Sequence, residues 1–194
     1  MASFTSPPHL TDFTLPLPAF SATRPQLKAV VVGGLIFSRT QPSEETPTAE
    51  PRVLLLQRAA TDSFPGRWEG PGGLSEHTDA SVLAGTAREV FEESGLHVRN
   101  VVDLVAVDEW THAKSGQIGK AAKFTFLVEV EEARVVGWED GIVLDPSEHQ
   151  AFVWATESEV RQSVEGKDTR FSFVGMNGEN LLTAFQLVKS KGAR

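Results

Sequence analysis

The chain of 194 residues contains no cysteine. Without a thiol it forms no disulfide, zinc ribbon or iron–sulfur cluster and has no cysteine nucleophile, so functions built on these are excluded. Tyrosine is absent as well, which leaves 12 Phe and 4 Trp as the large aromatic side chains.

Positive charge is scarce too. The chain carries 18 Lys and Arg against 26 Asp and Glu, a formal net charge of −8. Nucleic-acid polymers and anionic membranes are bound by a basic face, so we expect neither as a partner. A small phosphorylated ligand is compatible with this charge when metal ions mediate the contact.

Long apolar runs are also missing. The longest, residues 29–37, is far too short to cross a membrane as a helix. No Lys or Arg precedes Arg24, so the N-terminus resembles neither a secretory signal nor an Arg-rich transit peptide. We therefore expect a soluble, cytoplasmic protein. The sequence indicates no oligomeric state.

The composition, with 40% hydrophobic and 23% charged residues, favours one globular domain. Residues 1–27 are rich in Pro, Ser, Thr and Phe and show no period, so we expect an irregular arm there. The domain itself is expected to span residues 28–194. Within it, residues 39–51 contain three prolines and no large apolar side chain, which predicts a solvated, mobile loop.

Local patterns predict the elements of this domain. Apolar and β-branched runs predict strands at residues 28–38, 52–59, 96–107, 123–131 and 150–154. Periodicity and stop signals predict helices over 78–94, from Thr156 onward, and over 179–191. Thr156 and Glu159 have the spacing of a capping box. The polar, glycine-containing stretch 111–122 is expected to be a loop.

The predicted helix over 78–94 gathers three glutamates. At about 100° per residue, Glu89, Glu92 and Glu93 form an acidic patch opposite an apolar face. Like charges three and four residues apart each cost a few tenths of a kcal/mol, about 0.2–0.5, and the helix C-terminus disfavours anions by roughly 0.3–1 kcal/mol each.

Two interpretations of this patch are open. It is either a solvated acidic face or a site where a divalent cation reverses the sign of the repulsion. The turn at Gly72 and Gly73 delivers free backbone groups beside the patch, and this favours the cation.

The segment Arg88-Glu-Val-Phe-Glu-Glu-Ser-Gly-Leu96 resembles the second half of the Nudix box of the MutT/Nudix hydrolases. The front half differs from the box. Five residues after Gly73, Asp79 stands where the box has Glu, and one extra residue separates it from Arg88. This version is similar to a variant of fungal-type members of the family.

The resemblance implies a Nudix-type α/β/α sandwich with a mixed β-sheet. It also implies Mg²⁺- or Mn²⁺-dependent cleavage of a diphosphate bond in a nucleoside diphosphate derivative or another small organic diphosphate. By position, Glu92 and Glu93 are metal ligands, and Glu89 is a third ligand or the base that activates water. Arg88 would hold one of these carboxylates by a salt bridge, and the carbonyl of Gly73 would complete the metal shell.

Further candidate residues each have a structural alternative. Glu148 is either an additional acidic ligand or base, or a surface glutamate. Arg58 is either a phosphate contact or part of a surface salt bridge, and Arg67 is a weaker phosphate candidate. Trp110 either stacks on a flat group of the substrate or is a rim aromatic, whereas Trp68 is expected to pack in the core.

The remaining expectations concern histidines and activity. His77, His112 and His149 show no metal-ligand spacing and are interpreted as surface or loop residues. Markers typical of the ADP-ribose, dinucleoside tetraphosphate and coenzyme A subgroups are not matched, which favours a generic MutT-like diphosphate hydrolase. The alternative is a non-catalytic Nudix-fold protein that binds nucleotides or acts as a regulator.

Overall fold

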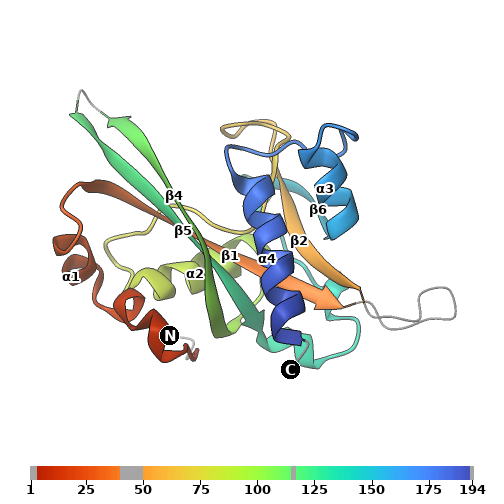
Figure 1. The fold of residues 1–194 in the computed structure, drawn as a ribbon, viewed down its shortest axis with the longest axis horizontal. Helices are drawn as coiled ribbons and strands as arrows, with labels where there is room; N and C mark the ends of the chain where they lie inside the picture. Colours follow the sequence, from red (N-terminus) through yellow and green to blue (C-terminus); the bar gives the residue numbers. More distant parts are fainter. Residues whose placement is uncertain (1–3, 40–49, 115–116, 193–194) are drawn as a thin grey trace, which may run out of the picture.

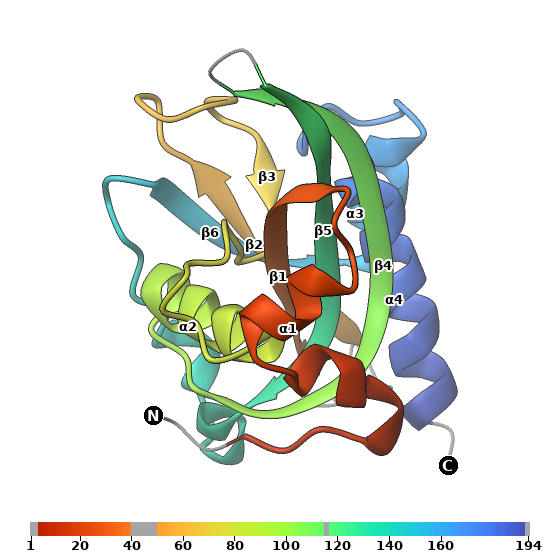
Figure 2. The same cartoon turned by 90° about the vertical axis from the view of Figure 1, so that its left-hand side faces the viewer.

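The computed structural model describes residues 4–39, 50–114 and 117–192. A strongly twisted sheet runs through the middle, and helices lie on both of its sides (Figure 1, Figure 2). The loop predicted at 39–51 falls almost entirely outside the described residues. No helix in the described part of the chain combines the length and apolarity needed to cross a membrane.

The sheet is mixed, as the resemblance implied. Its hydrogen-bonded order is β3-β2-β1-β5-β4, and β6 pairs with β2. β1 and β5 run parallel, with Val32 opposite Phe124, and the other pairs are antiparallel. The strands are β1 (Leu27–Arg39), β2 (Pro51–Arg58), β3 (Trp68–Glu69), β4 (Val98–Lys114), β5 (Gln117–Val130) and β6 (His149–Thr156).

The prediction of a loop over 111–122 is wrong. β4 and β5 form one long antiparallel ribbon in which Thr111 lies opposite Lys120 and Trp110 opposite Ala121. The ladder with the partner strand satisfies the backbone of this polar region, so it extends as strand without a continuous run of apolar residues. The register of β4 against β5 is irregular at three points between Val98 and Ala106, and β4 continues through them.

Helix α2 (Val82–Ser94) starts later than the predicted position 78. Ser81 is its N-cap and accepts a hydrogen bond from the Ala84 N–H at 3.1 Å. The helix ends at Gly95, whose φ of 74° lies in the left-handed region that glycine favours. The structure thus confirms the predicted stop and moves the start by one turn.

Two helices cover the opposite side of the sheet. The capping box predicted for α3 (Glu157–Val164) is confirmed, because Thr156 and Glu159 bond reciprocally. α4 (Asn177–Gly192) buries Phe185, whose ring centroid lies 4.9 Å from that of Phe37 on β1. α2 packs on the other face, so the sheet lies between two helical layers and the expected α/β/α sandwich is confirmed.

The N-terminal segment is more ordered than the irregular arm expected for residues 1–27. It contains a 3-10 helix, η1 (Pro8–Thr14), and a short α-helix, α1 (Leu17–Ala22). Phe13 and Phe20 are buried, and their ring centroids lie 5.4 Å and 5.5 Å from that of Phe124. This segment therefore completes one part of the hydrophobic core.

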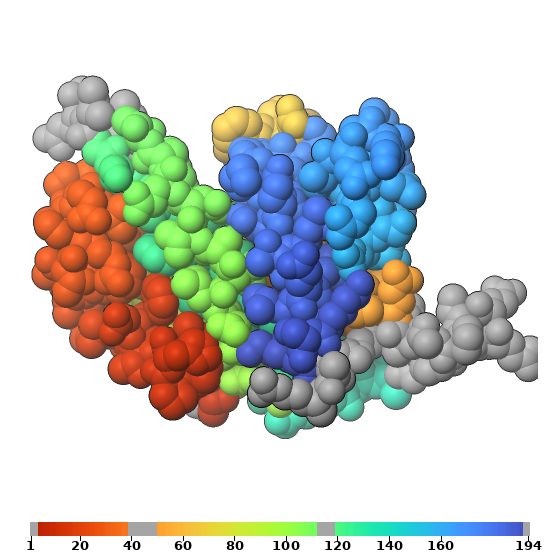
Figure 3. All heavy atoms as spheres, in the orientation of Figure 1, coloured from red at the N-terminus to blue at the C-terminus, as the bar shows by residue number. Residues whose placement is uncertain are grey.

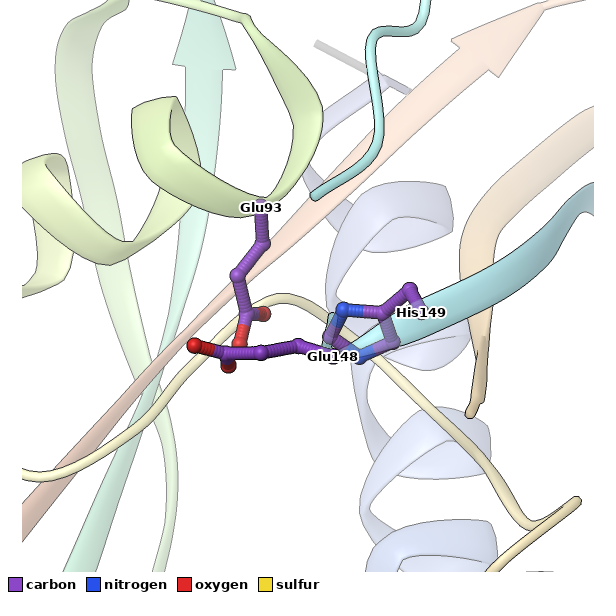
Figure 4. Close-up of side chains that lie close together, drawn as sticks. All are labelled: Glu93, Glu148 and His149. Carbon is purple, nitrogen blue, oxygen red and sulfur yellow. The ribbon is translucent and has the colours of Figure 1, made fainter. Parts of the chain in front are cut away.

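Two more 3-10 helices, η2 (Glu131–Arg134) and η3 (Trp138–Asp140), lie in the connection from β5 to β6. This connection returns the chain to the edge of β2, where His149 opposes Arg58. The start of β6 is thereby brought beside the C-terminal end of α2 (Figure 4).

Candidate active site

The last two turns of α2 bury two of the three glutamates of the predicted patch. Glu89 is 7% exposed and Glu93 is 4% exposed, whereas half of the Glu92 side chain remains exposed. A solvated acidic face is therefore excluded for Glu89 and Glu93. The apolar residue Phe91 is exposed instead and packs on His97, so α2 turns these carboxylates toward the interior.

Glu93 is the most strongly perturbed carboxyl group of this helix. Burial, together with the nearby negative charges of Glu89, Glu69 and Glu148, raises its pKa to about 9. One opposing contact favours the charged form, a hydrogen bond of 2.8 Å from the N–H of Gly72 to the Glu93 carboxylate. A cation placed among these groups would stabilise their ionised forms.

Glu89 lies directly against the backbone of Gly73. A Cβ atom at position 73 would come within 2.7 Å of both Glu89 carboxylate oxygens, so this position requires glycine for the approach. The carbonyl oxygen of Gly73 accepts the N–H of Val32 at 2.9 Å and keeps a second lone pair. Burial raises the pKa of Glu89, and the positive charge of Arg88 only partly offsets this increase.

Arg88 forms the predicted salt bridge, but its main partner is Asp79. Nε donates to Oδ1 at 2.9 Å and Nη2 to Oδ2 at 3.0 Å, a two-pronged pair. Nη1 also donates to Glu89 at 3.0 Å and to Glu92 at 2.7 Å. Arg88 thus fixes the positions of the Glu89 and Glu92 carboxylates on the helix.

Asp79 therefore positions Arg88, which gives a role to the residue where the sequence departs from the Nudix box. Burial opposes its charged form, but hydrogen bonds from Arg88 and from the Glu76 N–H hold the pKa of Asp79 below its usual value. Gly85 makes room for it, since a Cβ there would lie 2.7 Å from Asp79 Oδ2. The hydrogen bond with Asp79 in turn raises the pKa of Arg88.

Glu148 and His149 reach the site from the start of β6. One oxygen or nitrogen atom each of Glu93, Glu148 and His149 lies within 4.8 Å of the other two. Figure 4 shows the carboxylate of Glu148 extended toward that of Glu93, with the His149 ring beside them. Glu148 is exposed yet directed into the cluster, which favours the ligand or base over an ordinary surface glutamate.

The interpretation of His149 as a surface or loop residue is wrong. It is 2% exposed because β6 pairs with β2 and places it opposite Arg58, inside the domain. His77 is exposed, as expected. His112 lies in β4, and its side chain is outside the described part of the structure.

Arg58 is engaged by protein groups near this cluster. Its guanidinium pairs with Glu69 and Asp62 and donates to the Ser63 hydroxyl at 2.8 Å. The predicted surface salt bridge is thus a largely buried network, in which the Arg58 side chain is 17% exposed.

Glu69 is a site residue that sequence reasoning missed. It is 7% exposed, and although burial opposes its charged form, Lys123 and Arg58 hold its pKa below the usual value. The available signal was its isolation, since Glu69 is the only charged residue in the run 68–74. For His149 the signal was its position directly after Glu148.

Two other predicted residues lie apart from the carboxylates. Arg67 donates to the Ser172 hydroxyl and to the Phe173 carbonyl, and the structure does not bring it to the cluster. Trp110 is 41% exposed on β4 and borders a cavity of about 390 Å³ that Leu74 and His77 also line. Its role in substrate binding stays a prediction.

Trp68 packs in the core as expected. It is half-buried, and its ring meets that of Phe171 at 5.4 Å between centroids.

The surface has a hollow that sequence reasoning missed. It lies between the β4–β5 ribbon and the start of α4 (Figure 3). A small pocket there is lined by Lys123, Thr125 and Asn180 among others.

Comparisons with known proteins agree with this fold. The family model described as "NUDIX domain" matches residues 30–173. A "MutT-like protein" of Streptomyces ambofaciens is 29% identical over 141 residues, which make up 73% of this chain and 72% of that protein.

Solved structures share the architecture at low sequence identity. The MutT protein from Methanosarcina mazei has a TM-score of 0.52 and 20% identity, over 86% of this chain and 96% of that chain. The NUDIX domain of Shewanella oneidensis NrtR, solved with ADP ribose, has a TM-score of 0.57 and 14% identity, over 82% and 87%. These likenesses establish the fold, and the family model extends over most of the chain. The chain therefore belongs to the NUDIX domain family.

Proposed function

We propose that this protein is a divalent-cation-dependent hydrolase that cleaves a diphosphate bond in a nucleoside diphosphate derivative or another small organic diphosphate. The observation that carries the proposal is Glu93, a buried carboxyl on α2 that lies beside the carboxylate of Glu148 and the ring of His149. Such a group is costly for folding alone and gains most from a bound cation.

The residues present fit Mg²⁺ or Mn²⁺. Carboxylate and carbonyl oxygens are the ligands that hard cations prefer, and Glu93, Glu89 and Glu148 with the Gly73 carbonyl offer that set. Glu92, which the sequence predicts as a further ligand, would approach the cation from the solvent side. In the structure its carboxylate accepts a hydrogen bond from Arg88. A bound divalent cation neutralises the diphosphate, lowers the pKa of water and stabilises in-line displacement at phosphorus.

The chain's own groups then orient the reaction. Arg88, held by Asp79, keeps Glu89 and Glu92 on the helix face that meets the Gly73 turn. Glu89 and Glu148 are the two candidates for the base that takes the proton of the attacking water. Both are carboxylates close to Glu93, as their influence on its pKa indicates.

The substrate is expected to lie along the hollow between the β4–β5 ribbon and the start of α4 (Figure 3). Lys123 supplies a cation there, near Glu69 and next to Gly33. Arg58 could contact a phosphate only by exchanging its pairs with Glu69 and Asp62. Trp110 is the candidate for stacking on a base or another flat group.

The test is hydrolysis of a panel containing nucleoside triphosphates, dinucleotides, nucleotide sugars, ADP-ribose and prenyl or inositol diphosphates. ADP-ribose is included because the NrtR domain was solved with that compound. With Mg²⁺ or Mn²⁺ we expect turnover of at least one compound, lost in Glu93→Gln and Glu92→Gln. Glu165→Gln, on an exposed glutamate paired with Lys167, is the matched control.

A wild type that cleaves nothing in either metal, or site variants that match it, would refute the proposal. Tight nucleotide binding without turnover, unaffected by a chelator, would instead support the alternative of a non-catalytic binding or regulatory protein. The intact cluster of buried carboxylates favours catalysis, because binding alone gives no reason to gather them.

A further inference from the structure

His149 is buried without a hydrogen-bond partner for either ring nitrogen among the described residues. Its side chain is 1% exposed, and its backbone N–H is fixed by the Asp145 carbonyl at 2.8 Å. A neutral imidazole has one donor and one acceptor nitrogen. Burying both unpaired costs free energy, which indicates that a ligand completes this site.

One carboxylate oxygen near the His149 ring is already engaged. His149 Nε2 lies 3.9 Å from Glu69 Oε1, too far for a hydrogen bond, and that oxygen is paired with Arg58. On the other side are the carboxylates of Glu93 and Glu148, with ligand atoms of all three residues within 4.8 Å of one another. The ring therefore borders a space ringed by negative oxygens.

These separations are close to what one ion requires. With metal–ligand bonds of about 2.1 Å, neighbouring ligands of an octahedral ion lie about 3 Å apart and opposite ligands about 4.2 Å apart. Small side-chain movements would therefore bring Glu93, Glu148 and His149, which Figure 4 shows close together, onto one ion.

We propose that His149 is a nitrogen ligand of the cation held by Glu93 and Glu148, and that it shifts the site's preference from Mg²⁺ toward Mn²⁺ and Co²⁺. The inference rests on the proposed function, because it uses the same cation site. Mg²⁺ takes oxygen ligands and binds imidazole poorly, whereas imidazole suits the later first-row divalent metals. One buried histidine among carboxylates therefore separates these ions.

The experiment measures binding of metal alone to the full chain. Calorimetric titrations with Mn²⁺, Co²⁺ and Mg²⁺ are compared for wild type, His149→Gln and the control His9→Gln, an exposed histidine paired with Asp103. We expect His149→Gln to weaken Mn²⁺ and Co²⁺ binding at least tenfold and Mg²⁺ binding less than twofold. His9→Gln should match wild type.

A spectroscopic measurement does not depend on the folding of a variant. Pulsed electron paramagnetic resonance of wild type with bound Mn²⁺ should show coupling to a histidine ¹⁴N nucleus, replaced by ¹⁵N coupling when the protein is made with labelled histidine. His149→Gln should lose the signal, and His9→Gln should keep it.

The outcomes separate the two proposals. Mn²⁺ binding without nitrogen coupling, or equal loss of Mg²⁺ and Mn²⁺ binding in His149→Gln, overturns the role of His149 and leaves the hydrolase proposal standing. Absence of any divalent-cation binding by the wild type overturns both.

Discussion

Helices α2 and α3 carry the same acidic side chain in opposite settings. On α3, Glu157 and Glu159 occupy the first turn, where the helix dipole favours anions. Glu157 pairs with Lys189 and with Arg161, and Glu159 pairs with Arg170. The hydrogen bond from Lys189 leads the effects that lower the pKa of Glu157.

On α2, Glu89 and Glu93 lie in the last two turns, where the dipole disfavours them, and they are buried. Arg88 forms ion pairs with Asp79, Glu89 and Glu92. Among the described residues, the hydrogen-bond donor to Glu93 is the Gly72 N–H. Acidic groups on α3 therefore stabilise the fold, whereas those on α2 are retained at a cost to stability. A cation bound among these carboxylates would offset that cost, as the proposed function expects.

The largest effect is expected when the charge of Glu93 on α2 is removed. Glu93→Gln should lower kcat/KM by at least about a hundredfold, because a ligand of the metal that activates water is removed. The metal-free variant should unfold at a urea concentration no lower than wild type at pH 8, since glutamine is buried without the proton uptake that Glu93 requires. Loss of stability with activity retained would contradict the assignment.

A smaller effect is expected from the cation that holds the acidic groups of α2. Arg88→Ala should lower the free energy of unfolding by about 2–3 kcal/mol, because Asp79 loses its charged partner while buried. The exposed counterpart Arg161→Ala on α3 should cost less than about 1 kcal/mol. Urea titrations of both variants measure the difference, and equal losses would remove the distinction between the helices.

The pH dependence of stability tests whether the acidic groups of α2 lower the stability of the fold. The Glu93 carboxyl has an ordinary pKa of 4.5 in the unfolded chain and a pKa of about 9 in the folded protein. The folded state then binds more protons between these values, so metal-free stability should be greatest near pH 4.5 and decline as the pH rises toward 9. Urea unfolding in EDTA should show this decline.

Two controls identify its source. Glu93→Gln should flatten the decline, and saturating Mg²⁺ should reverse it by binding the ionised carboxylates. A metal-free wild type whose stability is constant across this range would show that Glu93 is ionised without cost.

The smallest effect is expected on α3. Glu157→Gln should change the free energy of unfolding by no more than about 1 kcal/mol, because its partners Arg161 and Lys189 are both exposed cations at the surface. It should leave kcat/KM at the wild-type value, because the residue lies on the helix that contributes nothing to the cluster. An activity loss comparable to that of Glu93→Gln would mean that acidic groups on both helices serve the reaction.

Local sequence was sufficient for several parts of this structure. Gly95 ends α2 and Thr156 with Glu159 starts α3, because capping depends on residues three or four apart. The spacing of Arg88 and the glutamates likewise placed the cluster on one helix. Apolar runs located β1 and β2 to within two residues at each end.

Other features depended on residues far apart in the chain. Residues 111–114 and 117–122 looked like a loop, because the strand pairing that satisfies their backbone cannot be read from their polar, glycine-containing sequence. The N-terminal segment looked irregular, because its apolar side chains find their pocket only beside Phe124 on β5.

For the site, helical spacing determined which helix carries the three glutamates, and the resemblance to the Nudix box identified Arg88 as a salt-bridge partner, which the structure shows for Glu89 and Glu92. Only the tertiary structure decided that Glu93 is buried, that Glu148 and His149 meet it, and that Glu69 takes Arg58. Strand pairing between β2 and β6 brings His149 beside Arg58, which is far from it in the sequence. Burial and proximity, the two quantities that give them their chemistry, exist only after that pairing.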